Sequence, residues 1–234
     1  MSIAVKNENP FIFVHLPRTA GRSITQALES AVNEKYILKF IQPHPINIRY
    51  KNDDGSYEYE KRVVRQLGLD PPSISNLRSK EDESYTFLHS SLEDFSAALN
   101  SDLEEYYKFT AVRNPWDMVL SYHNYSNHIR KLHEPFNEKR FTEESIPFVA
   151  THHDQVKMVS LNGKIKLNKF IKFENLKQGF KEILADLKLP QTDLPNIREG
   201  SKSVKDYRKF YNDESREKVE DLFKDYIEIF NYEF

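Results

Sequence analysis

The 234-residue sequence contains no cysteine, and this absence excludes several kinds of chemistry at once. Disulfide bonds, thiolate metal ligands and a cysteine nucleophile are all ruled out. The net charge of −2 provides no overall basic field, so the composition does not indicate a nucleic-acid-binding protein. Any anion-binding site must therefore depend on a local group of arginine and lysine side chains.

Long apolar runs are also missing. No run approaches the ~20 residues that a membrane-spanning helix needs, and residues 1–6 lack the apolar core of a secretory signal peptide. We therefore expect a cytoplasmic protein without a membrane span. With 38% hydrophobic and 13% aromatic residues, the chain can bury a full core, but it is short for two independent α/β domains. A single domain over 1–234 is the expectation.

Strand and helix patterns alternate along the chain, without internal repeats or low-complexity tracts. The expected strands are 11–16, 36–41, 85–89, 106–112 and 170–173, with a small hairpin formed by 156–161 and 164–167. The expected helices are 24–31, 60–67, 91–99, 115–130, 143–152, 176–187 and 214–230. This alternation predicts one α/β domain with a mainly parallel central sheet flanked by helices.

The turn after the first strand is basic and carries hydroxyl groups. Arg18, Thr19, Arg22 and Ser23 stand between the strand and the first helix. A strand, turn and helix in this order aim backbone N–H groups and a helix N-terminus at an anion. The turn does not match the nucleotide P-loop, Gly-x-x-x-x-Gly-Lys-Ser/Thr, because Gly21 is its only glycine. We predict that it binds a phosphate-like or sulfate-like group.

A second turn of the same kind follows the strand at 106–112. Arg113 stands where a P-loop enzyme has its Mg²⁺-binding aspartate. A guanidinium at that place repels a metal ion and attracts a phosphate. Asn114 fits a helix N-cap, Pro115 the first helical position and Asp117 a capping-box partner. The two turns together predict an anion site that uses side-chain cations and requires no metal.

Three stretches resemble the sulfotransferases that use 3′-phosphoadenosine-5′-phosphosulfate (PAPS), in the branch of carbohydrate and related sulfotransferases. Residues 15–23 resemble the motif His-x-Pro-Lys-Thr-Ala-Gly-Thr-Ser, which follows the first strand in that branch. Residues 112–122 resemble Val-Arg-Asn-Pro-Trp/Tyr-Asp-Arg-x-x-Ser-x-Tyr, the most specific of the three. Towards the C-terminus, 173–176 precede a helix, and a polar loop with 201–203 and 207–208 leads to the last helix. The resemblance implies a P-loop-like sulfotransferase fold.

The resemblance also implies roles for individual residues. The 5′-phosphosulfate would be wrapped by Arg18, Thr19, Ala20, Gly21, Arg22 and Ser23. The 3′-phosphate would be held by Arg113 and Ser121, and a loop would close over the nucleotide with Lys202, Ser203 and Arg208. Two residues depart from the branch pattern, since Arg18 replaces a lysine and Arg22 a threonine. Arginine keeps the positive charge but is longer and planar, so its contact geometry differs.

In-line sulfuryl transfer needs a cation at the leaving 5′-phosphate and a base at the acceptor hydroxyl. Arg18 is the candidate cation, and a histidine is favoured as the base. His89 ends a strand on the side where α/β proteins bind ligands, and its surroundings resemble the region of the base histidine in the branch. Glu29 and Glu34 remain alternative bases.

The other histidines have simpler interpretations. We expect His15 to make a structural hydrogen bond, and we expect His152 and His153 to be solvated because they lie in a polar stretch. His44, between two prolines, could line an acceptor cleft.

The acceptor site is expected in the variable loops 42–59 and 131–153. The resemblance favours a carbohydrate hydroxyl as acceptor and leaves a lipid, a secondary metabolite or another hydroxyl open. Two other functions also remain: an atypical P-loop kinase or phosphate-binding enzyme, and a non-catalytic nucleotide-binding module. The kinase predicts Mg²⁺-dependent ATP binding, which separates it from a sulfotransferase.

Overall fold

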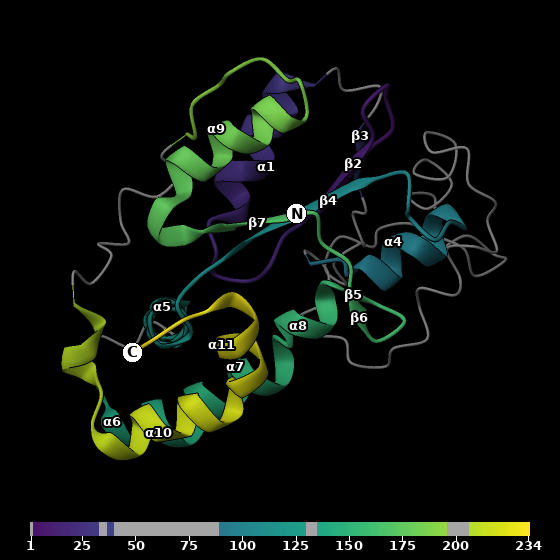
Figure 1. Ribbon diagram of the computed structural model, residues 1–234. Helices are drawn as coiled ribbons and strands as arrows, with labels where there is room; N and C mark the ends of the chain where they lie inside the picture. Colours follow the sequence, from purple (N-terminus) through teal and green to yellow (C-terminus); the bar gives the residue numbers. More distant parts are fainter. Residues whose placement is uncertain (1, 33–36, 40–88, 130–134, 196–205) are drawn as a thin grey trace, which may run out of the picture.

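The computed structural model describes residues 2–32, 37–39, 89–129, 135–195 and 206–234 (Figure 1). Several expectations fall outside these ranges. They concern the loop 42–59, the helix 60–67, most of the strand 85–89 and the residues Glu34, His44, Lys202 and Ser203.

A five-stranded sheet forms the centre of the described structure. Its strands, in spatial order, are β3 (Ile37–Lys39), β1 (Ile3–Val5), β2 (Phe11–Val14), β4 (Tyr107–Val112) and β7 (Lys169–Lys172). Strand β4 pairs in parallel with β2 and β7, whereas β1 is antiparallel to both of its neighbours. Four strands therefore run in one direction, as the expected α/β domain with a mainly parallel sheet requires. Strand β1 was not predicted, since three residues are too few to show a period.

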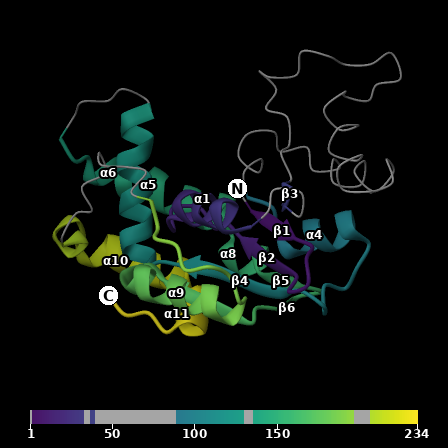
Figure 2. The ribbon, with the colours of Figure 1, turned by 90° about the horizontal axis from the view of Figure 1, so that it is seen from above.

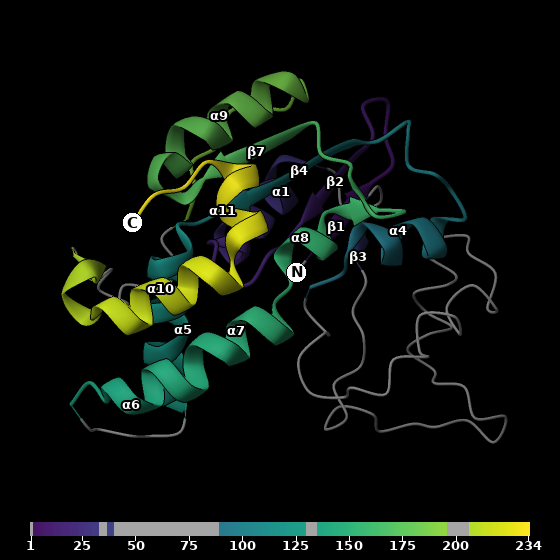
Figure 3. The ribbon, with the colours of Figure 1, turned by 60° about the horizontal axis from the view of Figure 1, so that its bottom comes forward.

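Helices cover both faces of the sheet (Figures 1 and 3). One face is covered by α1 (Gly21–Ala31) and α9 (Leu176–Asp186). The other face is covered by α4 (Leu92–Leu99), α5 (Pro115–Ile129), α7 (Ile146–His152), α8 (Gln155–Met158), α10 (Asp213–Leu222) and α11 (Lys224–Phe230). A hydrophobic core lies on each face of the sheet, and β2 contributes side chains to both because successive side chains of a strand alternate between faces. Phe11 and Phe13 enter the first core, and Ile12 and Val14 enter the second.

Two elements differ from the sequence-based expectation. The helix expected at 214–230 is interrupted at Phe223, which separates α10 from α11 and is itself buried. The first arm of the hairpin expected at 156–161 is mostly the helix α8, so the hairpin shortens to β5 (Ser160–Leu161) and β6 (Lys164–Ile165). Its turn is formed as predicted by Asn162 and Gly163, both with positive φ.

The parallel pairing of β2 with β4 brings the two basic turns together. Val14 lies opposite Thr110 in the register, so the carboxyl ends of both strands reach the same edge of the sheet. Figure 2 shows α4 at one end of the molecule, and α5 with the short helix α6 (Glu138–Arg140) at the other. No helix in the described ranges is long and apolar enough to cross a membrane.

Candidate functional site

The first turn has the backbone geometry of an anion-binding loop. Arg18 and Ala20 are both left-handed, with φ of 66° and 63°. Left-handed residues within a tight turn direct nearby backbone N–H groups into a common concavity. Ala20 is also the N-cap of α1 and provides no side-chain cap for the first N–H groups of the helix. These groups are therefore suited to an anionic partner.

Gly21 is required by a close approach. A Cβ added at this position would lie 1.7 Å from Cδ2 of His15 and 2.2 Å from its Nε2. Any larger residue would have to displace the His15 ring. The first helical residue is thus glycine because the ring of His15, which follows β2, occupies the space beside it.

The other side chains of the turn differ in their exposure. Arg22 is exposed and Ser23 is partly buried. Thr19 is completely buried, and its hydroxyl donates to the carbonyl oxygen of Leu16 at 2.8 Å. Thr19 is one of the residues expected to wrap the phosphosulfate, and its side chain is engaged within the turn itself. Its hydroxyl stabilises the turn from inside.

Arg18 reaches across to α5. Its Nη2 donates to Oγ of Ser121 at 2.8 Å and to the Ser121 carbonyl oxygen at 3.1 Å, and its Nε lies 3.2 Å from the same Oγ. The guanidinium also lies over the ring of Tyr125, 4.6 Å from its centroid. The Ser121 hydroxyl accepts from Arg18 and keeps its own hydrogen as a donor. The structure thus brings together two residues that were assigned to opposite ends of the nucleotide.

Arg113 forms the centre of the second turn and is 7% exposed. Its Nε donates to Asp117 at 2.7 Å, and its Nη1 donates to the carbonyl oxygen of Arg18 at 3.2 Å. The guanidinium carbon lies 4.3 Å from the centroid of the Phe173 ring. Arg113 therefore contacts the first turn directly, and Asp117 fixes its orientation.

The capping box predicted for Asp117 is not formed. The backbone N–H of Asn114 donates to Oε1 of Glu174 at 2.9 Å, while Asp117 binds Arg113. Asn114 does act as expected at the helix start, since its Oδ1 accepts from the N–H of Trp116 at 3.1 Å. The acceptor of the Asn114 N–H is thus the carboxylate of Glu174, 60 positions further along the chain, instead of the carboxylate of Asp117.

Residues near the C-terminus hold the second turn in place. The Tyr226 hydroxyl accepts from the N–H of Arg113 and donates to its carbonyl oxygen, both at 3.1 Å. The Asn114 side chain donates to the carbonyl oxygen of Glu233 at 2.8 Å. Arg208 is exposed on the short helix η6 (Tyr207–Phe210), which packs against α5. The structure therefore places Arg208 on an element beside the second turn.

His89 lies next to the first turn and has a defined tautomer. Its Nδ1 is 2.7 Å from the carbonyl oxygen of His15. Because a carbonyl only accepts, Nδ1 carries the hydrogen and Nε2 carries the lone pair. The rings of His89 and His15 meet edge to face at 4.4 Å. Burial lowers the pKa of His89 to about 4, so the ring is neutral at pH 7 and able to accept a proton at Nε2.

The alternative base Glu29 is less well placed. It lies eight residues after Gly21 on α1, so about 12 Å of helix separates it from the turn. Among the described candidates, His89 is the one beside the turn.

His153 is the functional candidate that the sequence analysis missed. It was expected to be solvated, but it is 8% exposed, with Tyr122 and Phe148 edge-on to its ring. Burial is the main cause that lowers its pKa to about 3, and the nearby His89, His152 and Arg18 contribute to this shift. Ile146 and Val149 lie on the same helical face at three- and four-residue spacing, a pattern that indicated this burial.

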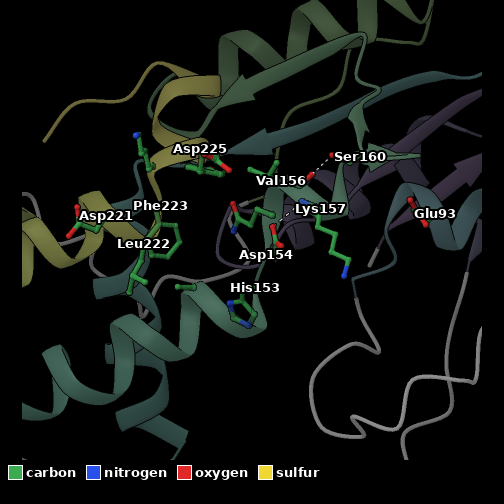
Figure 4. Close-up of a pocket in the computed structure, with 15 residues that line it drawn as sticks. Glu93, His153, Asp154, Val156, Lys157, Ser160, Asp221, Leu222, Phe223 and Asp225 are labelled. Carbon is green, nitrogen blue, oxygen red and sulfur yellow. Dashed lines mark hydrogen bonds between the residues drawn. The ribbon is translucent and has the colours of Figure 1, made fainter.

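A pocket of about 640 Å³ lies beside His153, between α8, the β5–β6 hairpin and α10–α11 (Figure 4). His153 lies at one side of it, and Asp221 and Asp225 lie across from it. Gln155 and Tyr226 also line this pocket, and they touch the first and the second turn respectively. Within the described ranges, no group of three or more potential metal ligands is present.

Comparisons with known proteins identify the family of the chain. Searches of curated proteins and of solved structures each found no match. A family model described as the sulfotransferase family matches residues 1–233, nearly the whole chain. The two basic turns, their order and their position at one edge of the sheet thus occur in a chain that belongs to the sulfotransferase family.

Proposed function

We propose that the protein transfers a sulfuryl group from PAPS to a hydroxyl acceptor, with a carbohydrate as the first candidate. The observation that carries this proposal is the hydrogen bond of 3.2 Å from Arg113 to the carbonyl oxygen of Arg18, which joins the two basic turns. PAPS carries anionic groups at both the 5′ and the 3′ position of one nucleotide. Two adjacent basic turns match this pair of charges.

The first turn is suited to the 5′-phosphosulfate. The bond between sulfur and the 5′-phosphate oxygen breaks while a bond from the acceptor oxygen to sulfur forms, so negative charge grows on the 5′-phosphate. The start of α1 and the Arg18 guanidinium lie where they can stabilise this charge, and Ser121 and Tyr125 hold the guanidinium in place. The second turn, with Arg113 and the start of α5, is suited to the 3′-phosphate.

His89 is the proposed general base. Its lone pair at Nε2 would take the proton of the acceptor hydroxyl as the new bond to sulfur forms. Bonding to the His15 carbonyl fixes the tautomer that this step requires. A bound anionic donor nearby favours the imidazolium that results.

A thermal-shift comparison tests the donor. We expect 3′,5′-ADP at 100 times its Kd to stabilise the protein by about 2.7 kcal/mol, and we expect Mg-ATP to have little effect. The Arg113→Ala variant should lose most of the stabilisation by 3′,5′-ADP. Stabilisation by Mg-ATP alone would indicate a kinase and overturn the proposal. Turnover of ³⁵S-labelled PAPS with a panel of carbohydrate acceptors then separates an enzyme from a non-catalytic binding module.

A further inference from the structure

Gln155 connects the first turn to a third part of the chain. It begins α8 and is 3% exposed, so its side chain lies inside the protein. Its Nε2 donates to the carbonyl oxygen of Pro17 at 3.0 Å and lies 2.8 Å from Sδ of Met118. One amide group thus contacts both the residue before Arg18 and the helix that follows the second turn.

The bond to Pro17 fixes the orientation of a whole peptide group. The peptide between Pro17 and Arg18 is planar and trans, so its C=O and N–H point in opposite directions. Because the C=O points to the buried Gln155, the N–H of Arg18 points to the other side of the turn. Gln155 therefore determines the side on which this N–H is presented.

The same bond opposes a conformational change that would otherwise be favourable. The left-handed backbone of Arg18, with φ of 66°, is strained for a residue other than glycine. Rotation of the Pro17–Arg18 peptide would relieve this strain and would turn the N–H of Arg18 inward. The rotation would also break the hydrogen bond from the Gln155 amide to the Pro17 carbonyl oxygen.

We propose that Gln155 is a positioning residue for the 5′-phosphosulfate end of the donor. It holds the Pro17–Arg18 peptide in the orientation that presents the Arg18 backbone to the 5′-phosphate. This role rests on the proposed donor, and it concerns only the 5′-phosphosulfate end of that donor. Neither of the two contacts of the Gln155 amide described above involves Arg113, so we expect the second turn to be outside its direct influence.

The test compares nucleotides that differ only in their phosphates. Affinities for 3′,5′-ADP, adenosine 5′-phosphate and adenosine 3′-phosphate are measured by calorimetry on the wild type and on Gln155→Met, which keeps the length of the side chain. We expect 3′,5′-ADP and adenosine 5′-phosphate to bind about 10-fold more weakly to the variant, as for the loss of one hydrogen bond. Affinity for adenosine 3′-phosphate should not change.

The matched control is Ser160→Ala. It removes a bond of 2.7 Å from the hydroxyl of Ser160, in β5, to the carbonyl oxygen of Val156, the residue after Gln155 in α8. This variant should bind all three nucleotides like the wild type. Gln155→Leu, a second apolar replacement, repeats the measurement if Gln155→Met does not fold.

Two results would overturn the positioning role. One is unchanged affinity for the 5′-phosphorylated nucleotides in a folded Gln155 variant. The other is an equal loss of affinity for all three nucleotides, which would indicate general destabilisation. If the wild type binds none of the three, the proposed donor itself is wrong and the role of Gln155 fails with it.

Discussion

Arg18 and Ser121 are joined side chain to side chain across 103 positions of sequence, by donor–acceptor contacts of 2.8 and 3.2 Å. A guanidinium can make both contacts and also donate to the Ser121 carbonyl, whereas a lysine ammonium is a single point charge. The ring of Tyr125, one helical turn further along α5, adds a stacking surface for the planar group. The arginine that replaces the lysine of related sulfotransferases is therefore matched to its surroundings in this chain.

The first prediction concerns Arg18. We expect Arg18→Ala to lower kcat with PAPS by about 10²–10³, because a fixed donor to the leaving phosphate is lost. Arg18→Lys should recover part of the rate, since it keeps the charge but loses the contacts to Ser121 and Tyr125. Steady-state kinetics with labelled PAPS measure both variants. An undiminished kcat in Arg18→Ala would exclude this residue from the transfer step.

The second prediction concerns the base. His89→Asn keeps a donor for the His15 carbonyl but has no lone pair at the position of Nε2. We expect kcat to fall by about 10²–10⁴, with unchanged affinity for 3′,5′-ADP. His152→Asn is the matched control, because the exposed His152 also places Nδ1 near a carbonyl, that of Phe148 at 3.1 Å. Equal rates in the two variants would refute a catalytic role for His89.

The third prediction concerns the contact between Gly21 and His15. We expect Gly21→Ala to destabilise the protein by about 1–3 kcal/mol, because the new Cβ would lie 1.7 Å from Cδ2 of His15. His15→Ala in the same chain removes the ring and should restore part of the loss. Urea unfolding of the two single variants and the double variant measures this coupling. Strictly additive effects would contradict the close approach.

The fourth prediction concerns pH and uses the buried His153. In the unfolded chain its pKa is about 6.5. In the folded protein burial lowers this pKa to about 3. Between these values the unfolded state binds a proton that the folded state does not, so the free energy of unfolding falls as the pH falls. The slope from this group reaches about 1.4 kcal/mol per pH unit.

Urea titrations of the wild type and His153→Phe, from pH 7.5 down to pH 5, measure this effect. The phenylalanine fits an aromatic environment and cannot titrate, so the variant should lose less stability on acidification. His152→Phe, an exposed neighbour, is the control and should behave like the wild type. Parallel curves for wild type and His153→Phe would show that His153 is solvated after all.

The two turns could be predicted from sequence because each is a local pattern. A strand that is followed by Pro17-Arg18 or by Arg113-Asn114, and then by a helical period, defines each turn within about ten residues. The sheet places these turns side by side for a general reason, since parallel neighbours end at the same edge. The fold class and the positions of the two basic turns were therefore predictable.

Contacts between distant residues could not be predicted in this way. Asp117 was a reasonable capping partner by spacing, but it lies beside the Arg113 guanidinium, and Glu174 takes the Asn114 N–H instead. His153 stands in a polar stretch, and only its spacing from Ile146 and Val149 indicates the burial that it has in the folded chain. The link from Gln155 to Pro17 spans 138 positions and leaves no local signal in the sequence.

The attachment of the second turn to Tyr226 and Glu233 has a consequence for how the protein is made. The turn itself is synthesised near the middle of the chain, but its partners are more than a hundred residues further on, at separations of 113 and 119. On a ribosome the Arg113 turn therefore lacks these supporting bonds until residues 226–233 have emerged. Closing such distant contacts is slow compared with local helix formation. The edge of the sheet that carries the two basic turns thus gains its full set of bonds later than the local helices form.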